Sequence, residues 1–389
     1  MIEPTPVPPA TLAARAARLR SSLPPATTAL AASHAGIRWL TGIVGAGHYL
    51  YGNTPAVAIV GPDGPVRLVV AAADLGWVAD EVDLDAVVPY GWFSYAGRHG
   101  GRIPGATTGR TLEEAVAIAL RATGATAVVA DDGLPWTRAA AIEAACGVTL
   151  QPGHELLRRA RAVKDAREIE LLRAANVAAE DALFDAVGKV RTGITELELL
   201  TLIQQGMLER DARPLLGAVG FTERGALVDA WPSDRALRPG DTIRFDIGCS
   251  YLGYHADMSR TAAFGRVPQT SRDAYAAILA GEDACLAATR AGAPAATVFN
   301  AGVDATRAAG IGDYARSHCG HGIGLEIYEP PLIADSSDTV LEAGMTLCLE
   351  TPLYRLDDVG LQVEDAVVVT ADGCDRLGRS PRAMIDIDA

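Results

Sequence analysis

The sequence lacks the features that would place the protein in a membrane or an oxidising compartment. Its 389 residues contain no uninterrupted apolar run of about 18 residues, so we expect no membrane span. The N-terminal residues MIEPTPVPPA carry neither a basic segment nor an apolar run, and no signal peptide is expected. The six cysteines form no CxxC pair and no dense framework, which favours reduced thiols and a cytoplasmic protein.

Basic residues are in the minority. The chain has 34 Lys and Arg against 48 Asp and Glu, a formal net charge of −14. This balance argues against nucleic acid or an anionic membrane surface as the principal partner. The hydrophobic content of 49% and the charged content of 21% are ordinary for a soluble globular enzyme. The length is sufficient for two domains and a sizeable core.

Two domains are predicted from the pattern of elements. Residues 1–152 contain a helix from Thr11, a strand at Thr28–Ala31, and the strand-like segments PAVAIVG, VRLVVAAAD and TAVVADD between Ala-rich helices, which indicates an α/β domain. Residues 153–389 begin with one long helical pattern, RRARAVKDAREIELLRAANVAAEDALFDAVGKV. Further helices are expected at about 195–210, 270–290 and 294–309, with antiparallel strands between them. This arrangement predicts an α+β domain with a bent antiparallel sheet flanked by helices.

Four carboxylates and one histidine stand in recognisable frames in the second domain. They are Asp246 in RFDIG, Asp257 in GYHADMSRT, His321 in CGHGIGLEIYEPP, Glu350 in GMTLCLETPLY and Glu364 in GLQVEDAVVVT. One imidazole with four carboxylates is a ligand set for hard to borderline divalent metals. Four carboxylates brought together without cations would repel one another and need raised pKa values. The set therefore points to a hydrolase with two metals.

The spacing of these residues indicates how they would meet. A symmetric turn between Tyr251 and Leu252 would place Asp246 directly opposite Asp257 in a hairpin. Glu350 and Glu364 lie on two further alternating strands, which could pair and present both side chains on the same face. A single such carboxylate would be interpreted as a solvated strand residue. Two hairpins of this kind in one domain favour a metal site.

These five frames, in this order, resemble the creatinase/aminopeptidase P/prolidase family of pita-bread metallohydrolases. The resemblance covers most of the chain and implies a smaller creatinase-type N-terminal domain before the pita-bread catalytic domain. It implies that Asp246 and Glu350 each bind one of two divalent metal ions, and that Asp257 and Glu364 bridge them. His321 would supply the sole nitrogen ligand. Oxygen-rich sites of this kind suit manganese, cobalt, iron or zinc. The closest members of the family imply a homodimer.

The resemblance also implies a reaction. Water activated by the two metals would attack an amide carbonyl, and Glu350 would carry the proton towards the leaving nitrogen. Cleavage of the bond before proline is typical of this branch. The expected substrate is therefore a small molecule or a short peptide.

Two positions depart from the family pattern. Asp229, in ALVDAWPSDR, stands where the peptidases of the family have a histidine, and Tyr328, in YEPP, stands where a second histidine is expected. Gln362 also replaces an arginine that is common in the prolidase branch. Tyr328 could donate a hydrogen bond to a developing oxyanion, whereas an ionised Asp229 could bind a cationic amine or guanidinium. We expect both residues to take part in catalysis and substrate binding.

Other residues near these frames are weaker candidates. Trp231 and His255 are expected to line the substrate pocket, and His318 is expected to be a packed loop histidine. The resemblance implies that His48 and Tyr51 lie where the N-terminal domain of a neighbouring subunit approaches the site in related dimers.

Three functions remain open from the sequence. The first is a two-metal hydrolase of an amide C–N bond, similar to an Xaa-Pro dipeptidase or aminopeptidase, with its pocket altered at Asp229 and Tyr328. The second is a hydrolase of a non-peptide C–N bond, similar to creatinase or ectoine hydrolase, or another metal-dependent enzyme of a specialised pathway. The third, a non-catalytic binding protein, is disfavoured because all five metal positions are present.

Overall fold

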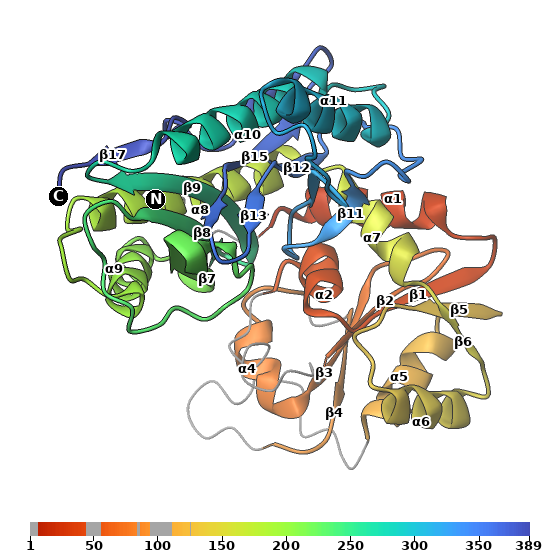
Figure 1. Cartoon of the computed structure of the whole chain (residues 1–389). Coiled ribbons are helices and arrows are strands. Elements are labelled where there is room, and N and C mark those ends of the chain that lie inside the picture. The colour runs from red at the N-terminus through yellow and green to blue at the C-terminus, as the bar shows by residue number, and fades with distance from the viewer. Residues whose placement is uncertain (1–6, 44–55, 84–85, 94–110, 125) are drawn as a thin grey trace. The chain divides into compact units, whose positions relative to one another are not determined.

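The chain folds into two compact units, each with its own sheet (Figure 1). The computed structural model describes residues 7–43, 56–83, 86–93, 111–124 and 126–389. In the described part of the chain, residues 7–161 belong to the first unit and Ala162–Ala389 to the second. The contacts thus assign the helix after residue 152 to the first unit. His48 and Tyr51 lie outside the described residues.

The first unit is an α/β domain, as predicted. Its elements are α1 (Pro9–Ser22), β1 (Thr27–Ala31), α2 (His34–Thr41), β2 (Val57–Val60), β3 (Arg67–Ala71), η1 (Ala72–Asp74), α4 (Leu75–Val78), β4 (Val87–Tyr90), α5 (Leu112–Arg121), β5 (Ala127–Ala130), α6 (Trp136–Cys146), β6 (Leu150–Pro152) and α7 (His154–Ala162). The six strands form one mixed sheet in the order β4-β3-β2-β1-β5-β6. Apolar residues of the strands and of α5 form its core, among them Leu30, Val57, Val69 and Val116.

The second unit contains the larger sheet and the predicted helices. Its elements are α8 (Ala166–Val187), α9 (Glu196–Leu208), β7 (Arg213–Phe221), η3 (Thr222–Ala226), β8 (Thr242–Tyr251), β9 (Tyr254–Phe264), α10 (Gln269–Ala288), α11 (Ala295–Ala308), β10 (Gly320–Gly322), β11 (Glu329–Leu332), β12 (Thr346–Glu350), β13 (Leu353–Arg355), β14 (Val359–Leu361), β15 (Glu364–Val369), β16 (Cys374–Arg376) and β17 (Ile385–Ile387). The sheet order is β11-β10-β12-β15-β9-β8-β7, with β16 on β15 and β17 on β9. Every pairing in it is antiparallel except that of β17 with β9.

The long helical pattern at the start of the second domain is two helices, and its prediction as one was wrong. Helix α7 ends at Ala162 and α8 begins at Ala166. Asp165 caps the second helix, because its side chain accepts from the backbone N–H of Glu168 while the Glu168 side chain accepts from the backbone N–H of Asp165. Lys164, within the break, donates its backbone N–H to the carbonyl of Gly344. The break therefore ties the start of the domain to the sheet.

The β8–β9 hairpin is present, but its predicted register was wrong by two residues. Asp246 lies opposite Ser259, and Asp257 lies opposite Gly248. The turn residues are Leu252 and Gly253, both with positive φ (47° and 86°), as a tight two-residue hairpin turn requires. A leucine in that conformation carries no sequence signal, so the turn was placed one residue too early. Because side chains alternate along a strand, the two aspartates still share a face.

The two faces of the large sheet differ in character. Residues such as Phe245, Ile247 and Leu349 are fully buried. Helix α8 packs on strands β8 and β9, where the thiol of Cys249 contacts the carbonyl of Ala175. Helices α10 and α11 form a second apolar cluster with β12 and β15, and Figure 1 shows both helices running beside these strands. The polar residues that alternate with these apolar ones lie on the opposite face of the sheet.

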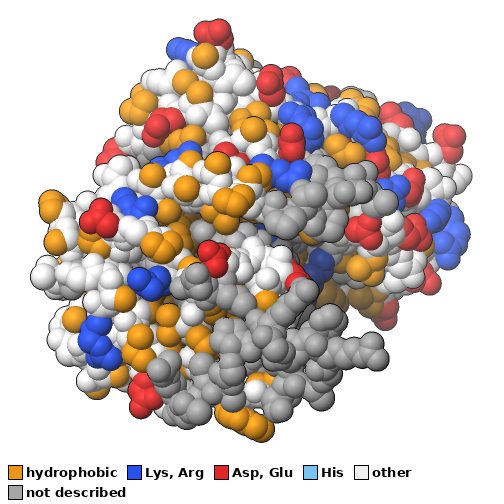
Figure 2. All heavy atoms as spheres, turned by 180° about the vertical axis from the view of Figure 1, so that it is seen from behind, with side chains coloured by type: hydrophobic (Ala, Val, Ile, Leu, Met, Phe, Trp, Pro, Cys, Tyr) orange, Lys and Arg blue, Asp and Glu red, His pale blue; other side chains and the backbone are white. Residues whose placement is uncertain are grey.

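Among the described residues, no helix combines the length and the apolarity needed to span a bilayer. On the face drawn in Figure 2, the described basic and acidic side chains lie interspersed. The acidic side chains form no separate patch on the described part of that face.

Candidate metal centre

All five predicted ligands lie on the polar face of the large sheet, on five neighbouring strands. Glu350 on β12 pairs directly with Glu364 on β15, as the predicted second hairpin required. Glu364 lies opposite Ser259 on β9, and Ser259 lies opposite Asp246 on β8. Asp257 is two residues from Ser259 on the same face. His321 on β10 lies opposite Cys348 on β12, two residues from Glu350.

The four carboxylates are removed from water and raise one another's pKa. Burial, followed by the charges of Asp246 and Glu350, raises the pKa of Asp257 well above its usual value. Burial and the neighbouring carboxylates do the same for Glu364. Burial raises the pKa of Glu350 to about 7, although Arg316 opposes the shift. The pKa of Asp246 is also raised, mainly by burial. Such a cluster carries its full charge only when cations compensate it.

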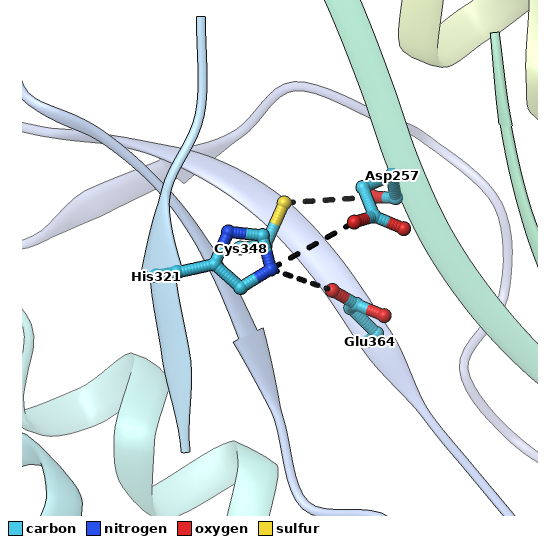
Figure 3. A group of neighbouring side chains, drawn as sticks. All are labelled: Asp257, His321, Cys348 and Glu364. Atoms are coloured by element: carbon cyan, nitrogen blue, oxygen red, sulfur yellow. Dashed lines mark hydrogen bonds and ion pairs between the residues drawn. The ribbon is translucent and has the colours of Figure 1, made fainter. Parts of the chain in front are cut away.

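The imidazole of His321 is oriented as a metal ligand. Its Nδ1 lies 3.0 Å from the carbonyl oxygen of Gly322, and burial lowers its pKa to about 4, so the ring is neutral with the proton on Nδ1. Its Nε2 then presents a lone pair, 3.7 Å from Asp257 Oδ2 and 4.0 Å from Glu364 Oε1 (Figure 3). These separations exceed a hydrogen bond and leave room for a shared ion.

Two residues of the centre were missed in the sequence. The thiol of Cys348 is buried with Asp257, His321 and Glu364, and one ligand atom from each of the four lies within 4.8 Å of the others. The hydroxyl of Ser259 lies 3.0 Å from Asp246 Oδ1 and 3.0 Å from Glu364 Oε2. Both residues share the strand face of the ligands, so the period of two that identified the ligands would also have identified them.

Three polar side chains surround Glu350. The Gln362 amide lies 3.3 Å from Glu350 Oε2 and 3.4 Å from Glu364 Oε2. On the other side, the Arg316 guanidinium lies 3.4 Å from Glu350 Oε1, and His318 Nδ1 lies 3.3 Å from the same oxygen. His318 is a loop residue, as predicted, but it also lines the cavity of the centre. Arg316 and His318 come from the loop before β10, where strand alternation gives no signal.

The ligands form the floor of a cavity of about 420 Å³, which Asp229, Tyr328, Arg316 and His318 also line. The Tyr328 ring stacks on that of His321, and the residue is 53% exposed. Burial and then the nearby carboxylates raise the pKa of Tyr328, which keeps its hydroxyl protonated.

Trp231 and His255 do not lie among the described residues that line this cavity. The Trp231 side chain is 71% exposed. His255 shares the strand face of Asp257, and its backbone N–H donates to the carbonyl of Gly324. Burial lowers the pKa of His255. Their predicted contact with substrate stays a prediction.

The segment that carries Tyr328 is fixed by a buried ion pair. Glu329 Oε2 accepts from Lys164 Nζ at 2.8 Å, and both side chains are inaccessible to solvent. The other oxygen of Glu329 accepts from the backbone N–H groups of Leu325 and Glu326. The turn between His321 and Tyr328 therefore has its backbone donors satisfied, which holds the tyrosine beside the histidine.

The residues present fit divalent metal ions. Asp257 Oδ1 is buried and has no hydrogen-bond partner among the described residues. A bare carboxylate oxygen among three further buried carboxylates, faced by a neutral imidazole lone pair, is an unfavourable arrangement without cations. Divalent metals would supply the missing partners of these oxygens.

A bent antiparallel sheet with helices on one face and a buried carboxylate-histidine centre on the other defines a metal-dependent hydrolase of the pita-bread class. Residues 170–371 match the model of metallopeptidase family M24. The chain belongs to this family.

Several of its relatives are dipeptidases by name. The chain is 33% identical to the probable dipeptidase PepE of Mycobacterium tuberculosis over 263 residues, 67% of this chain and 70% of that protein. It is 29% identical to the Xaa-Pro dipeptidase of Pyrococcus furiosus over 235 residues, 59% of this chain and 67% of that one. The solved structure of an Xaa-Pro dipeptidase from Bacillus anthracis matches with a TM-score of 0.84 at 24% identity, covering 97% of this chain and 100% of the other. This last likeness concerns the fold.

Proposed function

We propose that the chain is a dinuclear metal-dependent dipeptidase that cleaves the amide bond of a short substrate of the Xaa-Pro type. The observation that carries this proposal is the convergence of Asp246, Asp257, His321, Glu350 and Glu364 on the floor of one cavity. Five ligand residues exceed the need of a single tetrahedral ion, which supports two metals. The dipeptidase names of the relatives support the reaction type.

In this proposal, the carboxylates of Asp246, Asp257, Glu350 and Glu364 would hold the two ions, and His321 would supply the nitrogen ligand. When bound, the metals polarise the amide carbonyl and lower the pKa of water. Manganese, cobalt, iron and zinc all suit such a donor set.

The protein's own groups then handle the proton and the substrate. Glu350 accepts the proton of the attacking water at a carboxylate oxygen and passes it to the leaving nitrogen. Gln362, Arg316 and His318 hold that carboxylate from both sides. The protonated hydroxyl of Tyr328 donates a hydrogen bond to the oxygen that becomes negative. Asp229, an acidic group at the wall of the cavity, binds the cationic amine of the substrate.

A non-peptide C–N bond is the second candidate substrate. The observation that favours it is the acidic side chain of Asp229 in the cavity. A carboxylate there pairs with a guanidinium as well as with an amine, and such groups also occur outside peptides.

The test is elemental analysis of the purified protein together with activity on Xaa-Pro dipeptides before and after chelation. About two metals per chain with chelator-sensitive cleavage would support the dipeptidase. Two metals per chain without cleavage of the dipeptides would favour the second candidate, a non-peptide substrate. Failure to bind metal under any loading condition would contradict both.

We also propose that the enzyme is a cytoplasmic homodimer. All six cysteines are free in the structure, which supports a reducing compartment. Light scattering on the purified protein measures the mass in solution. A mass of one chain would contradict the dimer.

A further inference from the structure

A buried cysteine thiol lies beside the ligands of the proposed metal centre (Figure 3). Cys348 is on strand β12, directly opposite His321 on β10 and two residues before Glu350. Its neighbours Leu347 and Leu349 belong to the apolar cluster formed with α10 and α11. Because side chains alternate along a strand, the thiol lies on the other face of the sheet, together with the carboxylates.

The thiol is close enough to three of these ligands to share an ion with them. One ligand atom from each of four residues lies within 4.8 Å of the others, and the four are Asp257, His321, Cys348 and Glu364. Ligand atoms around a four-coordinate zinc ion are about 3.3–3.8 Å apart, given metal–ligand distances of about 2.0–2.3 Å. Side-chain shifts of about 1 Å would therefore close the group around one ion.

The atoms beside the thiol point to a cation at this place. Asp257 Oδ1 is buried and has no hydrogen-bond partner among the described residues. His321 Nε2 presents its lone pair to Asp257 Oδ2 and Glu364 Oε1, at 3.7 Å and 4.0 Å. The thiol of Cys348 lies 3.7 Å from the backbone carbonyl oxygen of Asp257. Because a thiol is a weak donor, it gives up little when a metal ion replaces its proton.

We propose that Cys348 is a sulfur ligand of the metal centre and makes the centre prefer zinc or cobalt to manganese. This inference rests on the proposed function for the presence of metal ions. Coordination forms a metal–sulfur bond and breaks the S–H bond, and the proton is released to solvent. Thiolate ligands favour zinc, whereas carboxylates also suit manganese. The thiol therefore narrows the range of metals that the oxygen and nitrogen ligands alone would accept.

The alternative role for Cys348 is structural, as a small buried side chain in the sheet. Cys249 on β8 is a matched case, because its thiol is also buried and lies 3.3 Å from the carbonyl of Ala175, on the face covered by α8. A structural thiol affects the binding of all metals alike and leaves no trace in the spectrum of a bound metal. A sulfur ligand affects zinc more than manganese and alters the spectrum of bound cobalt.

The experiment uses the full-length protein and its variants Cys348→Ala and Cys348→Ser, with Cys249→Ala as the control. Each protein is depleted of metal and saturated with Co²⁺ without oxygen, and elemental analysis measures the cobalt content. The absorption spectrum then reports the ligands, because a thiolate bound to Co²⁺ gives a charge-transfer band in the near ultraviolet. Competition with a chelator measures the affinities for Zn²⁺ and Mn²⁺.

We expect the charge-transfer band in the wild type and in Cys249→Ala, and its loss in both variants of Cys348. Cys348→Ala should lower the affinity for Zn²⁺ about 10²-fold and that for Mn²⁺ less than about 10-fold. A wild type that binds Co²⁺ without the band would overturn the inference, and this result needs no variant to fold. A band that persists in Cys348→Ala, or equal losses of affinity for Zn²⁺ and Mn²⁺, would also overturn it.

Cleavage of Ala-Pro by the same cobalt-loaded proteins separates this inference from the proposed function. Cleavage by a wild type that lacks the band would support the dipeptidase and contradict the sulfur ligand. A band without cleavage would support the sulfur ligand and contradict the dipeptidase. A wild type that binds no Co²⁺ would contradict both.

Discussion

The phenol ring of Tyr328 lies almost parallel to the imidazole of His321, with 3.7 Å between the ring centroids and 19° between the planes. His321 is the nitrogen ligand of the proposed metal centre, so the stack holds the tyrosine hydroxyl over the site. The side chain that replaces the expected histidine is thus both a packing partner of a ligand and a hydrogen-bond donor.

These two roles can be separated by substitution. Tyr328→Phe keeps the stack and removes the hydroxyl, and we expect kcat to fall about 10²-fold, in the range of a lost oxyanion donor, with unchanged metal content. Tyr328→Ala removes the stack as well and should also weaken metal binding, because the His321 ring loses its support. Steady-state kinetics and elemental analysis measure both effects. An unchanged kcat in Tyr328→Phe would show that the hydroxyl does not contact the reacting atoms.

A second prediction concerns the repulsion among the carboxylates. Asp257→Asn replaces a buried carboxyl whose pKa is raised well above its usual value by burial and by its neighbours, so that folding without metal must either protonate this group or bury its charge. In the metal-free protein we therefore expect this variant to raise Tm by a few degrees. It should lower metal affinity and activity by more than about 10²-fold, because a ligand is lost. The exposed Asp304→Asn is the matched control and should change neither. A lower Tm for metal-free Asp257→Asn would mean that the carboxylates are compensated without metals.

The pH dependence of stability follows from Glu350. Burial raises its pKa from 4.5 to about 7 in the folded, metal-free chain. The folded state then holds more protons than the unfolded state between these values, so the contribution of Glu350 to stability is present below pH 4.5 and is lost as the pH rises through 7. Glu350→Gln stays neutral throughout. We expect the Tm of metal-free Glu350→Gln minus that of metal-free wild type to increase from pH 5 to pH 8.

Thermal scans of both metal-free proteins in a buffer series measure this difference, and the titration of histidines common to both largely cancels. Added metal should reverse the trend for the wild type, because metal binding displaces protons and strengthens as the pH rises. A difference that is flat with pH would mean that Glu350 is ionised in the folded metal-free protein.

Strand alternation explains why the ligands could be predicted. Asp246 and Asp257 were placed on one face with a register wrong by two residues, and an error of two leaves every side chain on its own face. The pairing of Glu350 with Glu364 followed from the same period and is confirmed. The predicted ligand set was therefore correct although the predicted turn was not. The turn was predicted one residue too early because Leu252 adopts a positive φ, which a leucine does not signal in the sequence.

The walls of the cavity could not be predicted in this way. Arg316 and His318 lie on a loop, where no period relates sequence to direction, and their contacts with Glu350 depend on how the loop packs across the sheet. Cys348 had the right alternation, but a thiol among oxygen ligands was not recognised as part of the centre. The break between α7 and α8 likewise depends on the Asp165 cap within a continuous helical pattern.

Ser259 provides the last prediction. Its hydroxyl lies within hydrogen-bond distance of both Asp246 and Glu364, and it can donate its single proton to either of these ligands without adding charge. Ser259→Ala should lower metal affinity about 10- to 100-fold, the usual effect of removing a group that orients ligands. At saturating metal, kcat should recover most of its wild-type value, because the ligands themselves remain. Competition with a chelator measures the affinity, with Ser271→Ala, a buried serine on α10, as the control. Equal affinity in Ser259→Ala and the wild type would show that the strand pairing alone orients Asp246 and Glu364.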